Sequence, residues 1–185
     1  MPFRISGRTI GLVSLILFIL TIPAGNWVVM NVGTVCPPDG PCLIPVWPGI
    51  MSPSAVLFAG LALILRDAVQ SLLGKRWTLV AIAAGAVLSG FLSEPAIIIG
   101  STCAFLFSEL ADFAVYTPLR ERHLSLAIIL SGLGGSIVDS VIFLSLAFGS
   151  LDFVVGQVIG KFWMSLIAGA MIIMWRNARR NAQPA

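Results

Sequence analysis

Six long apolar runs alternate with short polar segments along this chain. The runs cover residues 10–30, 54–73, 77–93, 97–117, 124–148 and 153–175, and their lengths suit α-helices that cross a bilayer, which need about 17–25 residues. The first run continues past Ala24 to Met30, so we expect it to be a retained span and not a cleaved signal peptide. The pattern predicts an all-α, polytopic membrane protein with six transmembrane helices.

The basic residues predict the orientation of these helices, because cytoplasmic loops of membrane proteins collect Lys and Arg. Segments 31–53, 93–96 and 149–152 contain no basic residue, and their acidic residues are Asp39, Glu94 and Asp152. The segments on the other side hold Arg4, Arg8, Lys75, Arg76, Arg120, Arg122, Arg176, Arg179 and Arg180. Both termini are therefore expected in the cytoplasm.

The composition leaves no room for a soluble catalytic domain. Of the 185 residues, 58% are hydrophobic and 10% are charged, whereas about 25% are charged in an ordinary soluble domain. We therefore expect one membrane domain over residues 1–185. The net charge of +3 follows from the orientation signal, so no nucleic-acid partner is expected.

Six charged residues lie inside the predicted spans, where each costs about 2.5–3.5 kcal/mol at a helix centre. They are Arg66, Asp67, Glu109, Asp112, Asp139 and Lys161. Asp139 and Lys161 lie deepest and are the strongest site candidates. Arg66 and Asp112 lie nearer the cytoplasmic ends, where snorkelling to the surface or local pairing is the alternative.

Helical spacing adds polar and aromatic residues to these candidates. Gln70 follows Asp67 at i+3, Gln157 precedes Lys161 at i−4, and Trp163 lies in the middle of its run, where a core position is the alternative. Asn26 follows Pro-Ala-Gly, which either breaks the first helix to line a cavity or only kinks it. The predicted binding residues are Asn26, Asp67, Gln70, Phe105, Ser108, Glu109, Asp112, Ser136, Asp139, Gln157, Lys161 and Trp163.

These residue types suit a flat solute that forms hydrogen bonds. A carboxylate accepts the ring N–H and the exocyclic amine of a guanine-like face, a Gln or Lys donates to its carbonyl, and Phe or Trp stacks on the ring. The pattern by itself predicts a small-solute transporter without choosing the solute.

The cysteines and the single histidine argue against an enzyme. Cys36 and Cys42 lie in a proline-rich loop on the predicted outer side, where we expect a structural disulfide. A redox-active pair is the alternative, but catalytic pairs are commonly Cys-x-x-Cys. With His123 in a basic loop and no Walker A sequence, we expect no metal, no cofactor and no catalysis.

Small residues recur at four-residue intervals on two spans. They are Gly156 and Gly160 on the sixth, and Ala81, Gly85, Ser89 and Ser93 on the third. Such spacing allows close helix contact, either within one chain or in a homo-oligomer.

Four stretches of the chain resemble the VUT family, and in particular its YhhQ-type queuosine precursor transporters. They are residues 58–70, Ser-Glu-Leu-Ala-Asp within 108–120, Val-Asp-Ser-Val-Ile-Phe within 138–149, and Gly-Gln-Val-Ile-Gly-Lys-Phe-Trp-Met at 156–164. The resemblance implies import of a 7-deazaguanine base, such as 7-cyano-7-deazaguanine or queuine, across a bacterial inner membrane. By position it indicates Asp67, Gln70, Glu109, Asp112, Asp139 and Lys161.

The leading hypothesis is a secondary transporter with a midplane site that is exposed alternately to the two sides, built from two inverted three-helix halves. Proton coupling through Asp139 or Glu109 is part of this hypothesis. The alternatives are the substrate-binding S component of an energy-coupling-factor importer and a membrane thiol-redox enzyme that uses Cys36 and Cys42. The first run lacks the Ala-x-x-x-Ala motif expected of the S component.

Overall fold

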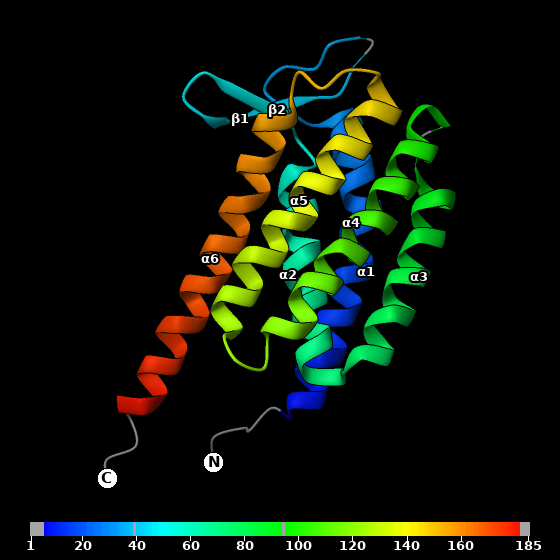
Figure 1. The fold of residues 1–185 in the computed structure, drawn as a ribbon. Coiled ribbons are helices and arrows are strands. Elements are labelled where there is room, and N and C mark those ends of the chain that lie inside the picture. The colour runs from blue at the N-terminus through cyan, green and yellow to red at the C-terminus, as the bar shows by residue number, and fades with distance from the viewer. Residues whose placement is uncertain (1–5, 39, 94, 182–185) are drawn as a thin grey trace.

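The computed structural model describes residues 6–38, 40–93 and 95–181, and it shows a bundle of helices with a small β-hairpin at one end (Figure 1). In these residues the helices are α1 (Gly7–Asn31), α2 (Val56–Leu73), α3 (Lys75–Leu92), α4 (Ile98–Leu119), α5 (Leu124–Phe148) and α6 (Val154–Asn181). Each of the six apolar runs therefore forms a helix.

Five of the helices, α1 to α5, are long and apolar enough to cross a membrane, and α6 contains the apolar stretch Val154–Ala168. Large apolar side chains such as Phe91, Ile99 and Val80 are exposed around the bundle. A surface of this kind would be unfavourable in water but suits contact with lipid tails. The chain is a polytopic membrane protein.

The helices run up and down, so that α1 begins and α6 ends at the end of the bundle away from the hairpin (Figure 1). The loops that join α2 to α3 and α4 to α5 lie at this same end. The sequence analysis assigned basic residues to this side. Some charged residues used for that prediction lie outside the described residues. They are Arg4 on the basic side, Asp39 and Glu94 on the opposite side, and the side chains of Arg176, Arg179 and Arg180.

Two glycines mark helix ends where the backbone takes a positive φ. Gly74, with φ of 93°, separates α2 from α3, and Gly149, with φ of 64°, ends α5 in the left-handed conformation. A residue with a Cβ is strained at such an angle, whereas glycine is not. These positions explain why apolar sequence on either side does not merge into longer helices.

The Pro-Ala-Gly-Asn stretch does not break the first helix. Of the two expectations for it, a break that lines a cavity is therefore wrong. α1 continues through Pro23 to Asn31. The hydroxyl of Thr21 donates to the carbonyl of Phe18 in the turn before the proline, at 2.6 Å. Such side-chain bonds and packing by neighbouring helices allow proline inside a membrane helix.

The segment between α1 and α2 forms a β-hairpin that the sequence analysis missed. Strands β1 (Leu43–Trp47) and β2 (Ile50–Pro53) pair antiparallel, with Leu43 opposite Pro53. Pro48 and Gly49 make the turn, and Gly49 has φ of 76°. A Pro-Gly pair is a turn signal, and it could have predicted the hairpin.

A disulfide between Cys36 and Cys42 closes the loop before β1. The backbone N–H of Cys42 donates to the carbonyl of Val29 in α1 at 2.8 Å, and its carbonyl accepts from the N–H of Ser54 at 2.8 Å. The disulfide loop is thereby tied to the end of α1 and to the start of α2.

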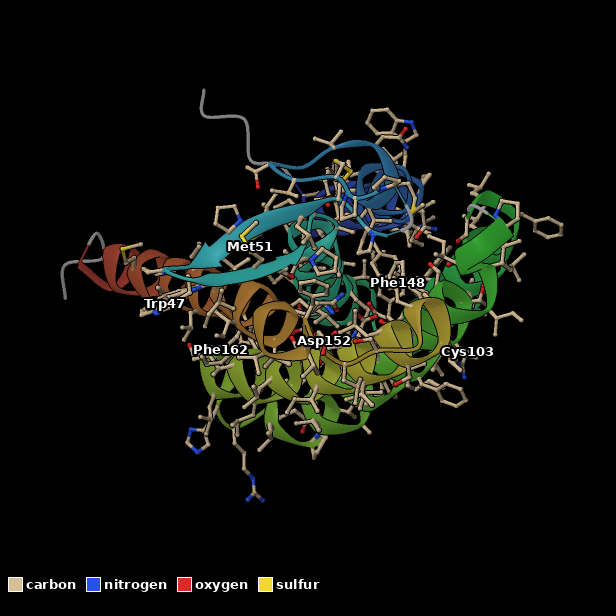
Figure 2. The ribbon with its side chains drawn as sticks, turned by 90° about the horizontal axis from the view of Figure 1, so that it is seen from above. Trp47, Met51, Cys103, Phe148, Asp152 and Phe162 are labelled. Atoms are coloured by element: carbon tan, nitrogen blue, oxygen red, sulfur yellow. A yellow bond between two sulfur atoms is a disulfide. The ribbon has the colours of Figure 1, made fainter. Side chains whose placement is uncertain are left out.

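The hairpin packs closely on α6 through the small residues of that helix. A Cβ on Gly156 would lie 2.1 Å from the carbonyl oxygen of Met51, and one on Gly160 would lie 2.6 Å from a methyl of Val56. Figure 2, viewed from the hairpin end, shows Met51 and Trp47 on the hairpin beside this helix. The four-residue glycine pair therefore serves a contact within the chain.

Replacing Gly156 with alanine should displace the hairpin, because the obstructing atom is backbone and cannot rotate away. We expect Gly156→Ala to lower the melting temperature of the detergent-solubilised protein by several degrees. Gly134→Ala is the matched control, since the nearest atom to its new Cβ is a methyl of Val115 at 3.8 Å and alanine favours a helix by about 1 kcal/mol. Equal melting temperatures for the two variants would contradict the packing described here.

Candidate substrate-binding site

A cavity of about 80 Å³, taken as the space open to the centre of a water-sized sphere, lies inside the bundle. All six helices line it. Its lining comes from the parts of the helices nearest the hairpin, and includes Asn26, Val56, Ser101, Phe143 and Gln157.

A smaller cavity of about 30 Å³ continues from the first toward the other end of the bundle. The two share five lining residues, Ala59, Ala62, Phe105, Asp139 and Lys161, and the smaller one adds Leu63, Ser108 and Glu109. We call them the main cavity and the inner cavity. Asp139 and Lys161 thus stand where one passes into the other.

Lys161 uses all three of its N–H donors on neighbouring side chains. They are accepted by the carboxylate of Asp139, by Ser140 Oγ at 3.0 Å and by Gln157 Oε1 at 2.5 Å. The ammonium is 1% exposed, and a buried cation of this kind is stable only when it is paired and hydrogen-bonded. Lys161 therefore positions its neighbours and has no donor left for a ligand.

The same contacts leave two polar groups free at this end of the main cavity. Asp139 binds Lys161 through Oδ2, and no hydrogen bond within the described residues uses its Oδ1. Gln157 must turn its oxygen toward Lys161, because an ammonium can only donate, and no described contact uses its amide nitrogen. This charged end of the cavity, defined by Asp139, Gln157 and Lys161, offers one acceptor beside one donor.

A second polar group lies at the main cavity, where Asn26 of α1, Ser89 of α3 and Ser101 of α4 are lining residues. Asn26 accepts a hydrogen bond from Ser101 at 2.8 Å and donates one to Ser93 at 2.8 Å, and Ser89 lies 2.9 Å from Ser101. None of these side chains is charged. We call Asn26, Ser89, Ser93 and Ser101 the neutral end of the cavity.

Three phenylalanines, Phe58, Phe105 and Phe143, add aromatic surface to the main cavity. Phe105 packs on Phe18 with ring centroids 5.8 Å apart. Rings of this kind favour a flat aromatic solute.

Trp163 does not line either cavity. Its side chain is 41% exposed and stacks on Trp47 of the hairpin, with ring centroids 5.9 Å apart. The reason is helical geometry, since two residues turn about 200° around an α-helix, and this puts Trp163 opposite Lys161. The core position expected as the alternative for Trp163 is therefore wrong, and its position outside both cavities gives no support to a ligand-stacking role.

Arg66 is the centre of a separate cluster between α2 and α4. Its guanidinium lies 2.9 Å from Asp67, 3.2 Å from Glu109 and 2.6 Å from Asp112. It also donates to Gln70 at 3.1 Å. Arg66 is completely buried, so it does not snorkel to the surface.

Further contacts extend this cluster, which we call the arginine cluster, toward the basic end of the bundle. Gln70 donates to Thr117 at 2.9 Å, and Arg120 donates to the carbonyl of Gln70 at 2.7 Å. These bonds join α2 to α4 on the side of the inner cavity away from the hairpin. The arginine cluster therefore closes the bundle below the cavities.

The predicted site residues thus fall into separate places. Asn26, Phe105, Asp139, Gln157 and Lys161 line the main cavity, and Ser108 and Glu109 line the inner one. Asp67, Gln70 and Asp112 belong to the arginine cluster. Ser136 is buried and donates to the carbonyl of Gly132, away from both cavities.

Sequence reasoning left several of these residues out of the site. Arg66 was not among the predicted binding residues, although local pairing was one of the expectations for it and Gln70 follows it at i+4, a spacing that indicates pairing. Ser89 was taken as a packing residue and Ser101 as part of a helix face, yet both line the main cavity. Within the described residues, no cluster of His, Cys, Asp and Glu is arranged to hold a metal ion.

Arg66 should be essential for stability because its guanidinium pairs with three buried carboxylates. We expect Arg66→Met to cost about 3–5 kcal/mol, the usual penalty for removing one partner of a buried ion pair. Adding Asp112→Asn should restore part of the lost melting temperature, since one uncompensated charge is removed. Arg66→Met with an unchanged melting temperature would show that the arginine cluster does not hold α2 to α4.

The sequence comparisons agree with this membrane architecture. A family model described as "Putative vitamin uptake transporter" matches residues 89–175, which run from the end of α3 into α6. The match includes Ser101, Asp139, Gln157 and Lys161 of the main cavity. No curated protein and no solved structure matched the chain. This match supports the VUT family of membrane transporters for the chain.

Proposed function

We propose that the chain is a secondary transporter that imports a queuosine precursor, a 7-deazaguanine base, into a bacterial cell. The observation that supports this most is the charged end of the main cavity. There an unused carboxylate oxygen of Asp139 and the unused amide nitrogen of Gln157 are held next to one another by Lys161.

This pair is complementary to a guanine-like face. Such a face carries a ring N–H and an exocyclic amine, both donors, beside a carbonyl acceptor. Asp139 accepts from the two donors, while Gln157 donates to the carbonyl. Lys161 had been an alternative donor to this carbonyl, but its three N–H groups are already used.

The same pair would discriminate against an adenine-like face. Adenine has an amine where guanine has the carbonyl, and an unprotonated nitrogen where guanine has the N–H. Its ring nitrogen would meet the carboxylate of Asp139 and its amine would meet the amide N–H of Gln157, so that both contacts are repulsive. Unpaired buried polar groups of this kind give strong selectivity.

The charge of the cavity also suits this solute. Asp139 and Lys161 neutralise each other, and the other lining residues of the main cavity are uncharged. A neutral heterocycle can therefore enter without leaving an uncompensated charge in the membrane. The rings of Phe58, Phe105 and Phe143 supply aromatic surface for its faces.

The position of the cavity fits a state that faces the outside. The cavity lies in the half of the bundle next to the hairpin, which the charge pattern assigns to the outer side, with six spans and both termini in the cytoplasm. The arginine cluster closes the opposite half. Transport would require α2 and α4 to separate there, and Glu109, which joins Arg66 to the inner cavity, is the residue best placed to couple a proton to that step.

Ligand binding by the purified protein tests this function. We expect 7-cyano-7-deazaguanine to raise its melting temperature and adenine to have no effect. Asp139→Asn should weaken binding about 10- to 100-fold, because a hydrogen bond to a charged group contributes about 1.5–3 kcal/mol. Ser136→Ala, on the same helix but away from the cavities, is the matched control and should bind as the unchanged protein does.

Gln157→Met provides a second variant in case Asp139→Asn fails to fold. It removes the amide N–H but leaves Lys161 paired with Asp139 and Ser140, so we expect a folded protein with about 10-fold weaker binding. If no 7-deazaguanine stabilises the unchanged protein, the proposed function is wrong.

A further inference from the structure

We propose that the arginine cluster is a proton-binding site, in which Asp67, Glu109 and Asp112 share two protons while the main cavity faces the outer side. The protons are taken up and released once in each transport cycle. This second part rests on the proposed function, whereas the binding of protons is argued from the cluster itself. The site is a set of three carboxylates around Arg66, and Glu109 is its connection to the inner cavity.

The charges in the interior of the bundle do not balance. Among the described side chains there, four carboxylates stand against one guanidinium and one ammonium. Asp139 and Lys161 pair one to one, so the excess lies in the arginine cluster, where Arg66 meets three carboxylates. One guanidinium compensates one carboxylate, and two negative charges remain. A buried carboxylate without a counter-charge becomes protonated instead of staying ionised.

No other described residue supplies the missing positive charge. Arg120 donates to the backbone carbonyl of Gln70 and forms no ion pair with a described carboxylate. Tyr116 is a neutral donor, and its hydroxyl contacts the carbonyl of Asp67 at 3.4 Å. The remaining described titratable residues at this end of the bundle are exposed, and they are Arg8, Lys75, Arg76, Glu121, Arg122 and His123.

One oxygen of Asp112 shows the excess charge most clearly. Asp112 is completely buried, and its Oδ1 lies 2.6 Å from the guanidinium of Arg66. Its Oδ2 has neither a hydrogen bond nor an ion-pair partner among the described residues. An ionised carboxylate is unfavourable in such a place, because buried polar oxygens are normally paired. A protonated Asp112 carries no charge, and its carbonyl oxygen still accepts from Arg66.

The cluster has no space for a larger cation. Neither Asp67 nor Asp112 lines the main or the inner cavity. Helix α5 packs directly on Asp112, since a Cβ on Gly135 would lie 3.1 Å from the Cβ of Asp112. A metal cation needs a shell of several oxygen ligands around it, whereas a proton needs no cavity. The ligand of this cluster is therefore the proton.

Glu109 connects the cluster to the cavities. Its Oε2 accepts from Arg66 Nε at 3.2 Å, and the residue also lines the inner cavity. The inner cavity shares Asp139 and Lys161 with the main cavity. Protons therefore reach the cluster from the hairpin side, which the charge pattern assigns to the outside.

The opposite side of the cluster is closed by the bonds of Gln70 to Thr117 and Arg120. Separation of α2 from α4 breaks these bonds and lets water reach the three carboxylates. Hydrated carboxyl groups ionise at neutral pH, so the two protons leave toward the cytoplasm. Each proton that binds from the outside is thereby released on the inside, and the cluster returns to its ionised form.

Infrared spectroscopy of the purified full-length protein tests proton binding, because a protonated carboxyl group has a C=O stretch that a carboxylate lacks. Exposed carboxylates are ionised at pH 7, so we expect this band at pH 7 to come from the cluster. Asp112→Asn removes one negative charge, and the band should fall by about half. Asp139→Asn is the matched control, because Asp139 is paired with Lys161, and it should leave the band unchanged.

Glu109→Gln keeps this test decisive if Asp112→Asn does not fold. The number of bound protons follows from the charge balance, so either variant should lose one of the two. Absence of the band from the unchanged protein would overturn the inference, as would a band that neither variant weakens.

Uptake of 7-cyano-7-deazaguanine by proteoliposomes tests the link to transport. An outer pH one unit below the inner pH should raise accumulation about 10-fold for each proton carried. Asp112→Asn leaves the main cavity intact, so it should bind the base as the unchanged protein does but accumulate about 10-fold less. An equal response of this variant to the pH gradient would overturn the coupling and leave the proposed function standing. A carboxyl band in a protein that binds no 7-deazaguanine would support the proton site and overturn the proposed function.

Discussion

The hydrogen bonds of one buried ammonium organise the site of this protein. Lys161 lies inside a membrane bundle, where an unpaired charge would be very costly, and it binds Asp139, Ser140 and Gln157. These bonds use all three N–H donors of the lysine and also fix the orientation of the carboxylate of Asp139 and the amide of Gln157. One oxygen of Asp139 and the amide nitrogen of Gln157 are left in the cavity as a matched acceptor and donor. In the proposed function, the lysine therefore acts on the ligand through its neighbours.

The rest of the fold keeps this arrangement in place. The hairpin packs on Gly156 and Gly160, which brings the start of α6, with Gln157, close to α2. On the other side of the cavities, Arg66 joins α2 to α4 through three carboxylates. The charged residues of the membrane region therefore have two different roles. Lys161 and Asp139 line the main cavity, whereas Arg66 and its partners join the helices beneath it.

Much of the fold could be predicted from the sequence, because a membrane helix leaves a strong signal in hydropathy. Each predicted run forms a helix, with ends that differ by a few residues, and α6 extends furthest, to Asn181. The hairpin was missed because the proline-rich segment before α2 does not show a clear alternation of polar and apolar residues. The continuity of α1 through Pro23 depends on packing by other helices, which no local pattern reveals.

The site was harder to predict, because burial cost identifies charged residues but does not show which of them meet. Asp139 and Lys161 could be found from their depth alone. The separation of Asp67 and Asp112 from the cavity follows from the position of Arg66, which only the three-dimensional structure supplies. Ser89 was hidden because a serine at a helix contact reads as a small packing residue. Trp163 was expected to face the interior because only its position along the helix was considered. Its angular position around the helix, opposite Lys161, was not.

The most direct test of the account is a crystal structure of the protein with 7-cyano-7-deazaguanine bound. The account predicts that the base lies in the main cavity, with its ring N–H and amine on the free oxygen of Asp139 and its carbonyl on the amide of Gln157. Lys161 should keep its three present partners. A base bound elsewhere, or one that displaces Asp139 to contact Lys161 directly, would contradict the central claim that the lysine acts only by positioning its neighbours.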